Sequence, residues 1–120
     1  MQGFGLMIEE LGPGAVRIAL RGELDLAHAY TFDEELRRVE ETRPSCVVLD
    51  LRGLAFLDST GLARLLAARR RARRAGHRLL IVRGPMAIQR LFALAAVDET
   101  FEMVNEVPVA LTAASGPRPA

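Results

Sequence analysis

The sequence predicts an α/β fold: one domain built on a mixed, mostly parallel sheet of four or five strands with helices packed against it. Two strand-like segments come first, and helical and strand-like segments then alternate, which is the order that parallel crossover connections produce. The run Cys46-Val47-Val48-Leu49-Asp50-Leu51 is almost continuously apolar, as in a strand covered on both faces. A length of 120 residues suits one domain, and we expect it to span residues 1–114, followed by a disordered Pro/Gly-rich tail at 115–120.

The first two strands are predicted to form a hairpin. Residues 4–11 mix apolar and acidic side chains and end at Gly12-Pro13-Gly14, a strong turn signal. Residues 15–20 alternate, with Arg17 opposite an apolar side, which is typical of a half-buried strand. The segment Gly22-Glu23-Leu24-Asp25 then leaves the strand, and Asp25 is suited to cap the next helix.

The first helix ends before Pro44, and its apolar residues recur at helical spacing. We expect ion pairs between Asp33 and Arg37 and between Glu34 and Arg38 on its solvent side. The residues expected to face the core are Ala29, Phe32, Leu36 and Val39.

After the apolar strand at 46–51, residues 53–57 are expected to be a loop, and a second helix covers 59–75 before Gly76. A buried strand at 79–82 follows. Gly84-Pro85 opens a third helix, then come a short strand at 101–104 and a helical end from near Glu106. The apolar faces of the last two long helices are Leu62, Leu65 and Leu66, and Ile88, Leu91, Phe92 and Ala95.

Composition excludes several kinds of chemistry. All 16 basic residues other than histidine are arginine, so a P-loop, a kinase site and Schiff-base catalysis all lack their lysine. One cysteine rules out an internal disulfide framework and favours a reducing cytoplasm. The net charge of +1 gives no global attraction to nucleic acid or membrane, and we expect no membrane span.

Ser59 and Thr60 place two hydroxyls at the start of the second helix, beyond the carboxyl end of a sheet strand, where open α/β sheets commonly hold ligand sites. A purely structural interpretation also fits, in which Asp58 or Ser59 caps the helix and Gly61 allows close packing. These residues alone favour the structural interpretation.

Catalytic and metal-binding alternatives fit less well. The turn around Ser59 has half of a nucleophile elbow, because Leu57 stands where that motif needs glycine, and neither His28 nor His77 can be placed beside it. Asp50 ends a strand but lacks the acidic cluster and lysine of a phosphoacceptor site. Cys46 and the histidines have no metal-ligand spacing, so we expect no metal or other cofactor, and no enzyme.

A basic run at 69–74 contains five arginines in the last turns of the second helix. Cations there interact favourably with the helix dipole, so a solvated helix end is the simpler interpretation. An acidic partner or nucleic acid is the alternative.

Taken together, the chain resembles the STAS domain, in particular bacterial anti-sigma factor antagonists, from about residue 4 to residue 111. The resemblance rests on the order and spacing of four motifs. These are Gly22-Glu23-Leu24-Asp25, Val48-Leu49-Asp50-Leu51, Phe56-Leu57-Asp58-Ser59-Thr60-Gly61-Leu62 and Arg90-Leu91-Phe92.

The resemblance implies a regulatory protein whose partner is an anti-sigma factor that is also a serine/threonine kinase. The unphosphorylated antagonist would bind this kinase and release the sigma factor for transcription; phosphorylation of Ser59 would end binding, and a serine phosphatase would reverse it. Thr60 stands where many members have serine. The implied partner surface contains Asp25, Asp58, Ser59, Thr60, Gly61 and Arg64.

The alternative within the same resemblance is a STAS subunit of a transporter or lipid-trafficking complex that is never phosphorylated. The oligomeric state, a monomer or a weak dimer, is not determined by the sequence.

Overall fold

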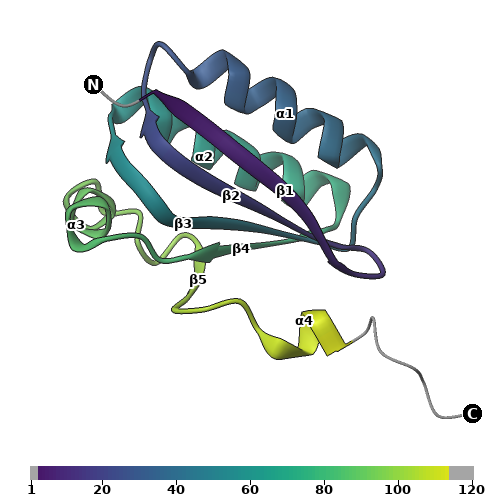
Figure 1. Ribbon diagram of the computed structural model, residues 1–120. Coiled ribbons are helices and arrows are strands. Elements are labelled where there is room, and N and C mark those ends of the chain that lie inside the picture. The colour runs from purple at the N-terminus through teal and green to yellow at the C-terminus, as the bar shows by residue number, and fades with distance from the viewer. Residues whose placement is uncertain (1–2, 114–120) are drawn as a thin grey trace, which may run out of the picture.

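The computed structural model describes residues 3–113, which form a five-stranded sheet in the order β1-β2-β3-β4-β5 (Figure 1). Strand β1 is antiparallel to β2, and the other neighbouring pairs are parallel, so the predicted mixed, mostly parallel sheet is confirmed. The elements are β1 (Phe4–Gly12), β2 (Ala15–Leu24), α1 (Ala29–Glu41), β3 (Cys46–Leu57), α2 (Ser59–Ala75), β4 (Arg78–Val82), α3 (Met86–Leu94), β5 (Glu102–Val104) and α4 (Val109–Ala113).

The β1–β2 hairpin is present as predicted. Its turn contains Gly14 at φ 76°, a left-handed conformation that glycine adopts without strain. Strand β2 continues four residues beyond the predicted end at residue 20, because Gly22 also takes a positive φ and lets the chain pass through an irregularity in the sheet.

The expected loop at 53–57 is wrong, because β3 continues to Leu57. The extended end of β2 supplies its partner: Leu54 is paired with Gly22 and Leu57 with Leu24, with shifts of register between these pairs and the earlier ones. The sequence hides this extension because Arg52, Gly53 and Ala55 break the apolar run. As a result, β2 and β3 end side by side, directly before α1 and α2.

Alternation along the strands creates two different sheet faces. Helices α1 and α2 lie on the same side of the sheet, and that side carries the main core (Figure 1). On the opposite side a smaller core forms only at one end, where the C-terminal segment around Val107 and Leu111 packs on Cys46, Val48 and Leu80. The main core includes Ile18, Leu20, Phe32, Leu36, Leu49, Leu51, Leu65, Ile81 and Phe92.

Two details predicted for α1 are wrong. The N-cap residue is His28, not Asp25. The carboxylate of Asp33 binds Arg64 of α2 at 3.1 Å and not Arg37, and Arg38 lies 3.7 Å from Glu35 and not near Glu34. A sequence pattern within one helix cannot anticipate that a neighbouring helix offers a nearer arginine.

The later helices follow the predictions with small differences. Helix α2 spans Ser59–Ala75 as expected and ends at Gly76 with φ +82°. In α3, Pro85 is the N-cap, and Ala95 caps the other end in an exposed position instead of facing the core. Helix α4 begins at Val109, three residues later than expected. The tail predicted at 115–120 lies outside the described residues.

Candidate functional site

The site predicted around Ser59 lies where β3 passes directly into α2. Asp58 is the N-cap, with extended backbone angles and a side chain that accepts a hydrogen bond from the N–H of Gly61 at 2.8 Å. Its second carboxylate oxygen accepts from the N–H of Leu26 at 3.1 Å, in the connection between β2 and α1. Asp58 therefore fixes both the start of α2 and the neighbouring loop.

Gly61 is buried in the first turn of α2, against the end of β2. A Cβ atom at this position would overlap the carbonyl oxygen of Leu24 and lie 2.7 Å from Cδ1 of Leu57. The absence of a side chain thus lets the helix approach the sheet closely, as the structural interpretation of Gly61 predicted.

Ser59 is exposed and Thr60 is partly exposed. Since Asp58 caps the helix, the cap does not need the Ser59 hydroxyl. Within residues 3–113 no hydrogen bond involves the side chain of Ser59. The choice between Asp58 and Ser59 as the cap is therefore settled for Asp58, and the serine hydroxyl is available at the surface.

Asp25 lies in the loop that Asp58 holds. Its carboxylate accepts hydrogen bonds from the N–H of His28 at 3.2 Å and from Nδ1 of His28 at 2.8 Å. The ring of His28 is stacked on Phe4, with 5.7 Å between centroids. Asp25 thus stabilises the turn before α1, at the same end of the sheet as Ser59.

Three exposed apolar side chains accompany these polar groups. Leu26 and Tyr30 are 75% and 72% exposed in and after the loop, and Phe56, two residues before Asp58, is 47% exposed. We missed them at the level of sequence, although Leu26 and Tyr30 both fall outside the apolar face predicted for α1. Arg64, the remaining predicted residue, lies one turn into α2 and donates to Asp33.

Comparison with known proteins identifies the family. Residues 9–105 match the family model described as Mlab, STAS domain. The chain belongs to the STAS domain family. The anti-sigma-F factor antagonist RsfB of Mycobacterium tuberculosis is 30% identical over 105 residues, which cover 88% of this chain and 85% of RsfB.

Solved structures place this STAS domain in the same group. The crystal structure of an anti-sigma factor antagonist from Mycobacterium paratuberculosis matches with a TM-score of 0.76 and 28% identity, covering 93% of this chain and 94% of that one. SpoIIAA shares the fold at 17% identity: its unphosphorylated form has a TM-score of 0.72 over 85% and 90% of the two chains, and the phosphorylated Bacillus protein 0.66 over 85% and 93%. The chain is thus a homologue of regulatory proteins, the anti-sigma factor antagonists.

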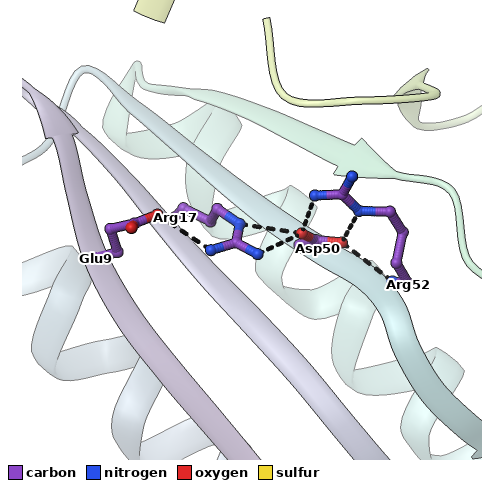
Figure 2. Close-up of polar contacts among 4 residues, drawn as sticks. All are labelled: Glu9, Arg17, Asp50 and Arg52. Carbon is purple, nitrogen blue, oxygen red and sulfur yellow. Dashed lines mark hydrogen bonds and ion pairs between the residues drawn. The ribbon is translucent and has the colours of Figure 1, made fainter. Parts of the chain in front are cut away.

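Asp50 of this STAS domain forms a polar cluster with Glu9, Arg17 and Arg52 on the sheet face opposite to α1 and α2 (Figure 2). The carboxylate is 2% exposed and accepts hydrogen bonds from Nε of Arg17 at 3.0 Å and Nε of Arg52 at 2.9 Å. Burial alone would raise the pKa of Asp50, but the hydrogen bonds from Arg52 and then Arg17 outweigh it and lower the pKa. The backbone N–H of Arg52 donates to the same carboxylate at 3.1 Å, so Asp50 connects β2 with the continuing part of β3.

Within residues 3–113 no hydrogen bond joins Ser59 to either histidine. The ring of His28 is engaged by Asp25, and His77 follows the far end of α2, about 25 Å from Ser59 by helix length. Burial lowers the pKa of His77. In the part of the chain that the structure describes, no group of three potential ligands could hold a metal ion, and no helix is both long and apolar enough to cross a membrane.

Proposed function

We propose that this STAS domain is a cytoplasmic anti-sigma factor antagonist controlled by phosphorylation of Ser59. Its unphosphorylated form binds an anti-sigma factor that is a serine/threonine kinase, and the phosphorylated form does not; a serine phosphatase restores the unphosphorylated form. The observation that carries this proposal is the exposed Ser59 hydroxyl beside a helix cap that Asp58 already completes. The homology to anti-sigma factor antagonists supports the partner class.

The proposed partner surface is the end of the sheet where β2 and β3 meet α1 and α2. Leu26, Tyr30 and Phe56 provide exposed apolar area, which a partner would cover and which contributes to binding when water is removed from it. Polar groups of the same surface provide hydrogen bonds and charge at its centre. These are the residues expected from the sequence: Asp25, Asp58, Ser59, Thr60, Gly61 and Arg64.

Phosphorylation would act on this surface and leave the domain folded. A phosphate adds a charge of about −1.5 to −2, which the N-terminus of a helix accommodates through its dipole and its free N–H groups. In the complex the same phosphate has to be desolvated next to the Asp58 carboxylate. A penalty of about 3–4 kcal/mol would weaken binding by a few hundredfold.

Arg64 has a supporting role in the proposal. It lies on α2 between the proposed surface and the Asp33 carboxylate of α1. Nε of Arg64 and Oδ1 of Asp33 are buried and have no hydrogen-bond partner in the described part of the chain. The Arg64 side chain as a whole is 40% exposed, so a partner carboxylate can pair with the exposed part of its guanidinium, which would add affinity and orient the complex.

The test compares Ser59→Ala with Ser59→Asp in binding to the anti-sigma kinase encoded in the same genome. We expect Ser59→Ala to bind as tightly as the unphosphorylated wild type, and Ser59→Asp to bind at least tenfold more weakly. Intact mass after incubation with the kinase and ATP should show one added phosphoryl group on the wild type and none on Ser59→Ala.

Thr60→Ala is the matched control, because it removes the neighbouring hydroxyl and leaves Ser59 in place. It should still be phosphorylated. If Ser59→Ala were phosphorylated and Thr60→Ala were not, the phosphorylated residue would be Thr60 and not Ser59. Equal binding of Ser59→Ala and Ser59→Asp would refute a phosphorylation switch at this surface.

The second candidate is a STAS subunit of a transporter or lipid-trafficking complex that is not phosphorylated. It is favoured by the family model, which is described by the name Mlab. Under this proposal the mass stays unchanged with every kinase of the organism, and the protein is isolated with a transporter ATPase.

A further inference from the structure

Strand β1 forms a free edge of the sheet. It is 9 residues long and, among residues 3–113, pairs only with β2, so its outer side presents backbone groups that these residues leave unpaired. Two apolar side chains at its centre, Met7 and Ile8, are 61% and 45% exposed. An edge strand of this length with exposed apolar residues is able to accept a further strand.

The hydrogen bonds of the hairpin determine which residues of β1 face outward. The N–H of Glu23 donates to the carbonyl of Gly3 at 3.0 Å, which marks their pair as hydrogen-bonded. Such pairs alternate along an antiparallel ladder, so Gly5, Met7 and Glu9 direct their backbone groups to β2. The outward N–H and C=O groups therefore belong to Phe4, Leu6, Ile8 and Glu10.

We propose that a second copy of this chain pairs antiparallel with β1 about a two-fold axis at Met7, which joins two sheets into one. In this register Leu6 of each copy lies opposite Ile8 of the other, and both have outward backbone groups, as hydrogen bonding across the edge requires. Gly5 lies opposite Glu9, and the two Met7 residues lie opposite each other. The contact is isologous, as expected of a dimer.

A charged residue beside the edge supports this register. Arg21 of β2 is paired with Gly5, and a Cβ atom on Gly5 would lie 2.5 Å from Cζ of Arg21. The guanidinium of Arg21 thus extends over Gly5 toward the outer side of β1. Among residues 3–113 no ion pair or hydrogen bond involves the side chain of Arg21, although it is a full positive charge.

The second copy supplies the missing partner of Arg21. Glu9 points to the same sheet face as Gly5, and the proposed register places Glu9 of one copy opposite Gly5 of the other. Its carboxylate is then held between Arg17 of its own chain, 3.1 Å away, and Arg21 of the second copy. The two-fold axis makes two such ion pairs.

The two neighbouring registers with a two-fold axis on β1 do not bring Arg21 beside Glu9. An axis at Ile8 places Glu9 opposite Met7 and Glu10 opposite Leu6, so that charged groups meet apolar ones. An axis at Leu6 places Glu9 opposite Gly3 of the second copy. Arg21 is paired with Gly5, two residues further along β1, so it does not lie beside Glu9 in this register. The axis at Met7 also places Glu10 opposite Phe4, but it alone brings Arg21 of one copy beside Glu9 of the other.

The first experiment measures the mass of the intact chain by sedimentation, from about 1 μM to about 1 mM. We expect a concentration-dependent rise from 13.1 kDa toward twice that value. Ile8→Pro removes an outward N–H without removing a hydrogen bond of the hairpin, and it should remain a folded monomer throughout. A wild type that stays monomeric over the whole range would overturn the proposal.

The second experiment uses charge reversal and mixing. Arg21→Glu and Glu9→Arg each place like charges opposite one another twice in their own dimer, which should weaken it by roughly tenfold to a hundredfold. Mixed together, the two variants have one native and one reversed ion pair, so native mass spectrometry should detect the mixed dimer in excess over both self-dimers.

Glu99→Arg is the matched control, because it makes the same charge change at an exposed residue between α3 and β5, at the edge of the sheet opposite to β1. It should dimerise like the wild type and show no preference for Arg21→Glu. Wild-type-like dimers of Arg21→Glu and Glu9→Arg, or no preference for the mixed dimer, would place any dimer contact elsewhere and contradict the proposal.

Discussion

Asp58 accepts a hydrogen bond from the backbone N–H of Leu26 at 3.1 Å, which joins the first turn of α2 to the loop between β2 and α1. The same carboxylate caps α2 through the N–H of Gly61. One side chain therefore determines the position of both loops at the proposed partner surface. This connection attaches the segment that carries Ser59 to the neighbouring loop.

Replacement of Asp58 tests this role. Asp58→Ala removes both hydrogen bonds and should lower the free energy of unfolding by about 1–2 kcal/mol, measured by urea denaturation. Asp58→Asn keeps one acceptor oxygen for the N–H of Gly61, but its NH2 group cannot accept from the N–H of Leu26, so it should recover about half of the loss. A variant Asp58→Ala that is as stable as the wild type would show that the two hydrogen bonds contribute little.

Charge at Ser59 should not unfold the domain. Ser59→Asp places a negative charge at the N-terminus of α2, so the free energy of unfolding should stay equal or rise by up to about 1 kcal/mol. Ser59→Lys, the control of opposite charge, should lower it slightly. If Ser59→Asp were instead destabilised by more than about 1 kcal/mol, a phosphate would act through the fold and not through the partner surface.

The close packing of Gly61 predicts a large effect from one methyl group. Gly61→Ala should lower the free energy of unfolding by about 1–3 kcal/mol, because the added Cβ overlaps the carbonyl of Leu24. Gly76→Ala is a useful comparison, because Gly76 has open space around it and only a positive φ, and about 1 kcal/mol is expected there. If Gly61→Ala left the free energy of unfolding unchanged, α2 would be able to move away from β2.

The buried carboxylate of Asp50 predicts an acid-dependent contribution to stability. Its pKa is lower in the folded state than in the unfolded chain, so its stabilisation is complete above the unfolded value of about 3.9 and is lost as the pH falls toward the folded pKa. Urea denaturation between about pH 7 and pH 2 should show this loss, and Asp50→Asn should remove that part of the pH dependence.

Asp50→Ala should lower the free energy of unfolding at neutral pH by about 3–5 kcal/mol. The reason is that Arg17 and Arg52 lose the carboxylate that they share. Glu102→Gln serves as control, since Glu102 also has a pKa lowered by hydrogen bonds from Arg78 but is exposed. Its effect should be small because solvent screens the pair. If the substitutions of Asp50 and Glu102 lowered the free energy of unfolding equally, burial would not determine the strength of these ion pairs.

Local patterns were sufficient for much of the fold. The span of α2 agreed with Ser59–Ala75 because a capping residue before it and a glycine after it flank a helical apolar face. The errors fell where the partner of a residue is distant in sequence. Residues 53–57 became strand through pairing with the extended β2, and Asp33 bound Arg64 across a helix–helix contact.

The candidate site shows the same division. Ser59, Thr60 and Gly61 were found from their position after an apolar strand and before a helix. Leu26, Tyr30 and Phe56 were missed, because exposure depends on which neighbouring elements cover a side chain and not on the side chain itself.

The sequence by itself determined the class of fold, the family resemblance and the segment that carries the proposed switch, since these depend on periodicity, turn residues and motif spacing along one chain. Only the tertiary structure decided that Asp58 is the cap, that Asp50 is held by two arginines and that Arg21 lies over Gly5 with no ion pair among residues 3–113. Each of these outcomes depends on distances between residues from different elements, and the folded sheet alone brings those residues together.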